Sequence, residues 1–162
     1  MAKKPWWKGS RGEWYVIIQV LLFALVAFGP TSLPGWPAWP WPWSIIAVIA
    51  GVVLGGIGGL LILGGVLSLG RNLAAVPHPK DDATMVETGA YKLVRHPIYS
   101  GIIFGAFGWA LLHNGTLTLL YALILFVFFD VKSRREEKWL SRKFPQYRAY
   151  QQRVRKLIPY LY

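Results

Sequence analysis

The sequence has 162 residues, of which 54% are hydrophobic and only 15% are charged, and this excludes an ordinary soluble domain. The net charge of +11 comes from Lys and Arg residues confined to three blocks, residues 3–11, 71–95 and 132–156. Such blocks between uncharged stretches are typical of the cytoplasmic segments of a membrane protein, and we expect no nucleic-acid partner. The absence of cysteine excludes disulfides and cysteine-based metal sites.

The first uncharged stretch, residues 14–70, is long enough for two membrane-spanning helices of about 20 residues each. We expect the first helix at 14–28, where Gly29-Pro30 ends it, and the second at 44–69. The connecting loop, 34-PGWPAWPWPW-43, alternates Pro with Trp. Pro disfavours a helix and Trp prefers the headgroup region, so this loop is predicted to form an aromatic belt at the outer membrane face.

Glycines mark one face of the second helix. Gly51, Gly55 and Gly59 recur at four-residue spacing, which lets another helix approach closely. We interpret this face as a packing seam within the monomer, with a dimer seam as the alternative.

A second apolar unit follows the loop at 70–94. It is predicted as a helical hairpin, with arms at 97–112 and 116–129 and a turn at His113-Asn114-Gly115. Each arm is short for a hydrocarbon core of about 30 Å, and the second can extend through Asp130 toward Glu137. Pro145 divides the basic segment beyond into expected amphipathic helices at 131–143 and 146–157.

These elements predict an all-α polytopic membrane protein with about four transmembrane helices and a cytoplasmic amphipathic C-terminal segment. All three basic blocks then lie on the cytoplasmic side, so both termini are expected there, and the basic residues can contact anionic membrane lipids. We expect a single domain over 1–162, with two spans in 1–69 and a polar core in 70–159.

The hairpin brings 95-RHPIYSG-101 and 136-EEKWL-140 to the same membrane face, so their polar side chains are expected to converge. Pro97 suits the first turn of a helix, whose unpaired N–H groups favour an anion. Two glutamates can bind an amine or ribose hydroxyls. A ligand that carries a carboxylate, an ammonium and a sugar fits; S-adenosylmethionine has all three, as do other ligands. The expected cluster comprises Arg95, His96, Tyr99, Glu136 and Glu137.

A purely structural interpretation of this cluster is also open, in which Arg95 and the glutamates form salt bridges and His96 caps the helix. Other chemistries find less support. The three histidines lack metal-ligand spacing, so no metal site is expected, and neither a G-x-S-x-G motif nor a P-loop occurs.

The segment 89-GAYKLVRHPIYSG-101, the pair Glu136-Glu137 and the segment 144-FPQYRAYQQRVRKLIP-159 together resemble the isoprenylcysteine carboxyl methyltransferase and phospholipid methyltransferase superfamily. The resemblance covers residues 70–159, and Pro145 stands where relatives often have Gly. It implies a membrane enzyme that binds S-adenosylmethionine in a pocket open to the cytoplasm, while a lipophilic or lipid-linked acceptor enters from the bilayer. The residues it implies around the cofactor are Tyr91, Arg95, His96, Pro97, Tyr99, Gly101, Glu136 and Glu137.

The acceptor group stays open at this point. A carboxylate needs only a cation such as Arg95 or Arg135 to orient it, whereas an amine must lose a proton, which His96 or a glutamate could accept. Arg95, His96 and Arg135 are therefore the catalytic candidates. Isoprenylcysteine-type carboxyl O-methylation is the first interpretation, and phospholipid N-methylation and thiol S-methylation are alternatives. An NADPH-dependent membrane reductase and a non-enzymatic scaffold are alternatives of other classes.

Overall fold

The computed structural model describes residues 12–74, 76, 78 and 82–162. These residues form α1 (Glu13–Phe28), α2 (Trp43–Leu69), α3 (Pro97–Leu112), α4 (Thr116–Lys143) and α5 (Tyr147–Arg153), with short 3-10 turns η2 (Gly70–Asn72) and η3 (Gly89–Lys92). None of the described residues belongs to a multi-residue strand. The predicted all-α class is confirmed.

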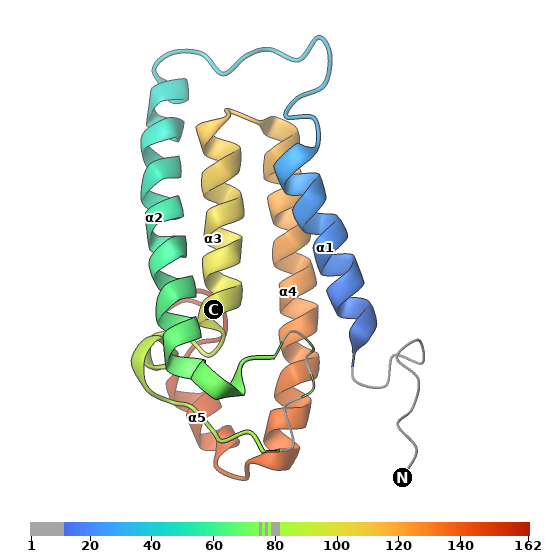
Figure 1. Cartoon of the computed structure of the whole chain (residues 1–162). Coiled ribbons are helices and arrows are strands. Elements are labelled where there is room, and N and C mark those ends of the chain that lie inside the picture. The colour runs from blue at the N-terminus through green and yellow to red at the C-terminus, as the bar shows by residue number, and fades with distance from the viewer. Residues whose placement is uncertain (1–11, 75, 77, 79–81) are drawn as a thin grey trace.

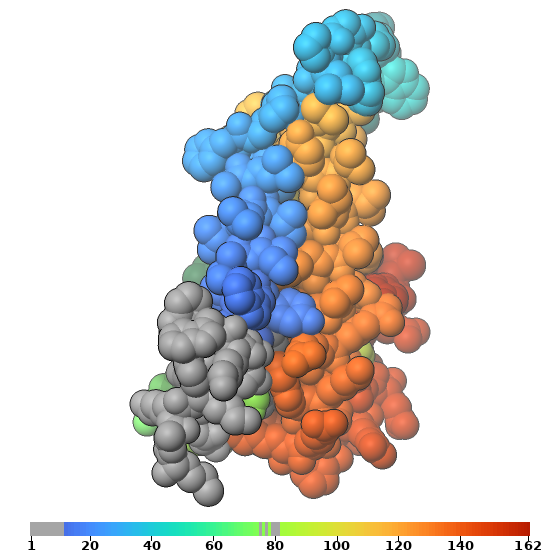
Figure 2. Space-filling view, turned by 90° about the vertical axis from the view of Figure 1, so that its right-hand side faces the viewer, coloured from blue at the N-terminus to red at the C-terminus, as the bar shows by residue number. Residues whose placement is uncertain are grey.

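The four long helices stand side by side in the order α2, α3, α4 and α1 (Figure 1). Both helices of the first uncharged stretch and the first arm of the hairpin end within a residue of the predicted boundaries. The hairpin turn is also as predicted, and Asn114 adopts the left-handed conformation there (φ 48°). Seen from the side, α1 covers a face of α4 and the Pro-Trp loop lies at one end of the bundle (Figure 2).

Within the part of the chain that the structure describes, two helical segments are long and apolar enough to cross a membrane, Trp43–Asn72 and Thr116–Lys143. Helices α1 and α3 are apolar but have only 16 residues each. Large apolar side chains face outward along the bundle, for example Leu60, Leu67 and Val127. An outward-facing apolar surface of this extent indicates a bilayer environment.

Helices α2 and α3 pack through glycines from both sides. A Cβ added at Gly58 would lie 2.6 Å from the Gly101 carbonyl oxygen, and one at Gly51 would lie 2.8 Å from the Gly108 carbonyl oxygen. These distances leave no room for a side chain, so the seam within the monomer is confirmed at Gly51. However, the seam follows the seven-residue spacing of Gly51, Gly58 and Gly65, because α3 runs nearly along α2. Gly59 lies on the exposed side instead.

The C-terminal segment departs from the predicted pair of helices. The first predicted helix, 131–143, is the continuation of α4, and the second ends at Arg153 rather than at 157. Beyond α5 the chain is extended, and Val94 and Arg155 form an isolated parallel bridge. The side chains of Tyr147, Tyr150 and Leu157 are buried, so this segment packs on protein.

Candidate functional site

A cavity of about 460 Å³ is lined in part by residues of α5. Figure 1 shows α5 at one end of the helical bundle. Helices α1, α3, α4 and α5 contribute to the wall of the cavity, together with Leu69 at the end of α2 and the segment between α2 and α3. Its size is that of a pocket for a cofactor-sized molecule. One part is apolar, with Ile98, Ile102, Leu140 and Phe144, and the other carries the polar groups described next.

Arg95 and Glu137 form a buried ion pair at the base of this cavity. Arg95 Nε lies 2.7 Å from Glu137 Oε1, and the same guanidinium donates to the carbonyl oxygens of Gln151 (3.2 Å) and Val154. Gln151 also donates to Glu137 Oε2 at 2.9 Å. Arg95 therefore connects α4 with the end of α5.

His96 and Tyr99 lie one above the other at the start of α3. Their rings stack with centroids 5.3 Å apart, and His96 Nε2 lies 3.0 Å from Glu137 Oε1. The Tyr99 hydroxyl donates to Glu136 Oε2 at 2.7 Å. His96 occupies the N-cap position of α3 without a side-chain capping bond, because its imidazole is turned toward the glutamates.

The extended residues after α5 fix the entry to α3. The backbone N–H groups of Arg95 and His96 donate to the carbonyl oxygens of Arg155 (2.8 Å) and Lys156 (3.2 Å). Lys156 in turn donates to the Asp130 carboxylate on α4. The polar groups of the site are thus held between α3, α4 and the 154–156 segment.

Three tyrosines outside the long helices line the cavity, Tyr91, Tyr147 and Tyr150. Burial raises the pKa of all three hydroxyls, so they are protonated donors at neutral pH. The Tyr150 hydroxyl donates to the Tyr91 carbonyl oxygen at 2.6 Å. By contrast, the buried Tyr147 hydroxyl has no hydrogen-bond partner among the described residues. A bound polar ligand would supply that partner, since buried polar groups are rarely unsatisfied.

Most of the expected site residues converge. The side chains that line the cavity are Tyr91, Arg95, His96, Tyr99 and Glu136. Glu137 lies behind them and holds Arg95 and His96 in place. Pro97 and Gly101 are buried against α2, where an added Cβ at Gly65 would lie 3.1 Å from Pro97 Cγ. These two residues position the start of α3 rather than line the cavity.

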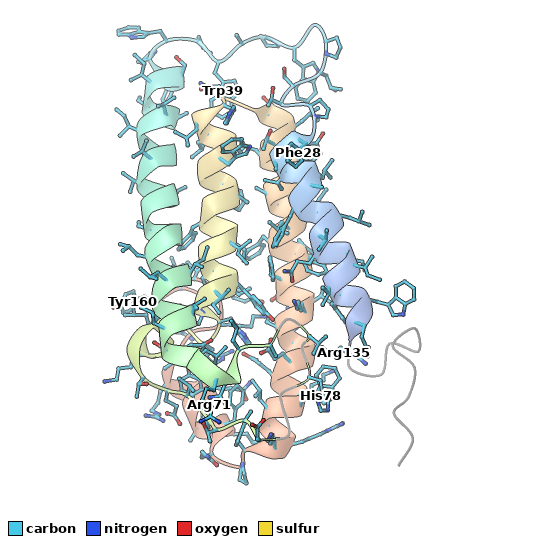
Figure 3. The ribbon with its side chains drawn as sticks, in the orientation of Figure 1. Phe28, Trp39, Arg71, His78, Arg135 and Tyr160 are labelled. Atoms are coloured by element: carbon cyan, nitrogen blue, oxygen red, sulfur yellow. The ribbon has the colours of Figure 1, made fainter. Side chains whose placement is uncertain are left out.

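Arg135 is placed differently from the other candidates. Its side chain is exposed and stacks over Trp139, with 5.0 Å between the guanidinium carbon and the ring centroid. Figure 3 shows Arg135 beside His78, which packs on the same Trp139 ring. Arg135 does not line the cavity.

The sequence reasoning missed Lys132 and Gln19. The buried Lys132 ammonium lines the cavity and donates to Gln19 Oε1 of α1 at 2.5 Å. By sequence alone, Lys132 belongs to the basic block at residues 132–156. The available signal was its helical spacing, because Lys132 and Glu136 lie one turn apart on the same face of α4.

A second, apolar groove of about 260 Å³ lies between α1, α3 and α4. Its walls include Phe23, Gly105 and Leu125, and Ile102 lines both this groove and the polar cavity. An apolar groove therefore adjoins a polar cavity, an arrangement suited to a reaction between a polar and a lipophilic molecule.

The polar cavity has the donors and acceptors for a cationic, sugar-containing ligand. Glu136 can accept from hydroxyl or ammonium groups, the unpartnered Tyr147 hydroxyl can donate, and Tyr and Phe rings offer faces for a purine or a sulfonium. These residues fit S-adenosylmethionine. Arg95 itself is not available to a phosphate group, because it is already engaged by Glu137 and two carbonyl oxygens.

The fold and the site together define a small helical membrane protein with a polar ligand cavity at one end. The phospholipid methyltransferase family matches residues 46–147, most of the chain. The chain therefore belongs to this family, within the superfamily of membrane methyltransferases that includes the isoprenylcysteine carboxyl methyltransferases.

Individual relatives agree with this membership. A probable protein-S-isoprenylcysteine O-methyltransferase of Oryza sativa subsp. japonica is 32% identical over 115 residues, which cover 68% of this chain and 60% of that protein. The protein-S-isoprenylcysteine O-methyltransferase of Saccharomyces cerevisiae is 36% identical over 84 residues, 51% of this chain and 35% of that protein. The cobalt-zinc-cadmium resistance protein CzcN of Cupriavidus metallidurans is 27% identical over 151 residues, 93% of this chain and 63% of that protein. The chain spans about three fifths of the length of the rice relative.

Proposed function

We propose that this protein is an S-adenosylmethionine-dependent methyltransferase that acts on a lipophilic acceptor at the cytoplasmic face of a membrane. The observation that carries the proposal is the buried Tyr147 hydroxyl, which has no hydrogen-bond partner among the described residues, in a cavity that also presents Glu136 and adjoins an apolar groove. Family membership supports methyl transfer as the chemistry. In this proposal residues 1–162 form one domain with four spans and both termini in the cytoplasm.

Tyr91, Tyr99, Glu136 and Tyr147 would hold the cofactor, with Arg95 and His96 ordered behind them by Glu137. When bound, S-adenosylmethionine supplies a methyl group that leaves its sulfonium sulfur, while the electron pair of the carbon–sulfur bond stays on sulfur. The chain's own residues then need only to align the acceptor and exclude water, because the methyl group is already activated. The acceptor's apolar part would occupy the groove beside Ile102.

The isoprenylcysteine relatives and the description of the family suggest two acceptors. Carboxyl O-methylation is supported by the isoprenylcysteine relatives. Phospholipid N-methylation is the second candidate, in keeping with the family's description. Thiol S-methylation remains a third acceptor chemistry available to this site.

Calorimetric titration of the purified protein in detergent tests the cofactor. We expect saturable binding of S-adenosylhomocysteine and no binding of NADPH. Binding of NADPH alone would assign the protein to the reductases, and binding of neither would favour a scaffold. The matched variant Tyr147→Phe should weaken S-adenosylhomocysteine binding.

A further inference from the structure

We infer that Lys132, oriented by Gln19, is the cation that receives an anionic acceptor group, and that it selects acidic lipids over amines. This inference rests on the proposed function and adds the charge of the acceptor to it. The groups that carry it lie in one layer of the bundle, between the polar cavity and the apolar groove.

The position of Lys132 follows from the order of residues along α4. Leu125, Phe129, Lys132 and Glu136 follow one another on the inward face of this helix, from the groove to the cavity. Leu125 lines the groove, whereas Lys132 and Glu136 line the cavity. Lys132 is therefore the charged cavity residue of α4 that is nearest in sequence to the groove.

Gln19 and two aromatic rings set the direction of the ammonium. Lys132 Nζ lies 2.5 Å from Gln19 Oε1 and 5.1 Å from the centre of the Tyr99 ring. The Phe129 ring centre is 5.8 Å away. A 1% exposed lysine held in this way is costly to bury, so its position at the cavity wall indicates a task. An ammonium has three N–H donors, and a ligand oxygen would share them with Gln19 and the other contacts of Lys132.

The two charged α4 residues that line the cavity lie one helical turn apart, and Tyr99 contacts both through its hydroxyl and its ring. Glu136 lies toward His96, where a cationic sulfonium or ammonium is favoured. Lys132 stands one helical turn nearer the groove. A lipid acid that enters from the groove thus meets a cation first, whereas a lipid amine meets a like charge, which is unfavourable at low dielectric.

The reaction of such an acid needs no base. A carboxylate oxygen forms the bond to the methyl carbon with its own electron pair, the carbon–sulfur bond breaks with its pair left on sulfur, and no proton moves. A positively charged ammonium at the acceptor position is therefore sufficient, and a proton acceptor is not needed. In this inference Lys132, and not Arg135, is the cation that orients the carboxylate. Arg135 is exposed and stacks over Trp139.

Helix α1 supplies Gln19, the residue that orients the Lys132 ammonium. Residue 19 lies outside residues 46–147, the part matched by the family. The first helix would therefore contribute to acceptor selection in this protein and not only to anchoring.

The test compares acids with their neutral amides. Binding of N-acetyl-S-farnesylcysteine and its carboxamide, and of palmitate and palmitamide, is measured by calorimetry with the detergent-purified wild type and with Lys132→Met and Lys132→Arg. We expect the wild type to prefer at least one acid over its amide. Lys132→Met should weaken binding of that acid by about 10- to 100-fold and leave amide binding unchanged, while Lys132→Arg retains the acid preference.

S-adenosylhomocysteine binding separates the two proposals. It should be the same in Lys132→Met as in the wild type. Loss of S-adenosylhomocysteine binding in parallel with the acid would place Lys132 in the cofactor site and overturn the inference. So would a wild type without acid preference in either pair, or an unchanged preference in Lys132→Met. A wild type that binds no S-adenosylhomocysteine refutes the proposed cofactor, while the acid-to-amide ratio still decides the role of Lys132.

Discussion

Arg95 and Glu137 are joined at 2.7 Å beneath the cavity, and neither carboxylate oxygen of Glu137 faces the ligand space. Oε1 contacts Arg95 and His96, and Oε2 contacts Gln151. Glu136, one residue earlier, lines the cavity. Two adjacent glutamates therefore have separate tasks, because neighbouring residues on a helix point in directions about 100° apart.

This division predicts different outcomes for the two glutamates. Glu137→Gln should lower the thermal midpoint strongly, since loss of one partner of a buried ion pair costs about 3–5 kcal/mol. Glu136→Gln should leave the midpoint nearly unchanged and weaken S-adenosylhomocysteine binding. Thermal unfolding in detergent and calorimetry measure the two effects. Equal destabilisation by both variants would contradict the division.

Tyr147→Phe should have opposite effects on stability and on binding. Without ligand, the variant should be as stable as the wild type or more so, because an unsatisfied buried hydroxyl costs about 1–3 kcal/mol. S-adenosylhomocysteine binding should weaken by about tenfold, as expected for one lost hydrogen bond. Tyr150→Phe is the control, and it should destabilise the ligand-free protein because Tyr150 donates to the Tyr91 carbonyl oxygen. A Tyr147→Phe variant that binds normally would place the ligand elsewhere.

The glycine seam predicts that alanine substitutions at neighbouring glycines of α2 differ strongly in their effect on thermal stability. Gly58→Ala should lower the thermal midpoint, since its Cβ would meet the backbone of α3 and overpacking costs about 1–3 kcal/mol. Gly59→Ala, the next residue, should be neutral because its Cβ would meet nothing within 4 Å. The pair is compared by thermal unfolding in the same detergent. Equal effects would mean that α2 and α3 do not pack through this seam.

The apolar groove can be filled without disturbing the polar cavity. A Cβ at Gly105 would meet nothing within 4 Å, and this residue lines the groove. Gly105→Leu should therefore weaken binding of the farnesylated acid by about tenfold or more, since it displaces several buried methylenes. Binding of S-adenosylhomocysteine should not change. Normal binding of the acid by this variant would show that its chain lies outside the groove.

Much of this architecture could be predicted from local patterns. The uncharged stretches and the Gly29-Pro30 and Asn114-Gly115 signals gave the helix ends, and the hairpin topology was sufficient to bring Arg95 and His96 to the glutamates. The shortness of α5 could not be predicted in this way. Tyr147, Tyr150, Val154 and Leu157 follow a helical period, but residues after 153 are extended because they pair with the backbone before α3.

The roles of individual polar residues also could not be predicted from local sequence patterns. Arg135 and Lys132 belong to the same basic block, and only the packing of α1 against α4 buries Lys132 next to Gln19. Similarly, the sequence does not distinguish Gly59, which is exposed, from Gly58, which contacts α3. Such differences depend on the rotation of each helix toward its neighbours.

The pairing of residues 155 and 156 with Arg95 and His96 has a consequence for biosynthesis. These two residues are translated after every side chain that lines the cavity. A nascent chain whose long helices are already in the membrane still lacks the backbone acceptors that hold Arg95 and His96 at the entry to α3. The ligand site is thus completed only when residue 156 has left the ribosome, so a chain stalled earlier would be inserted but unable to bind.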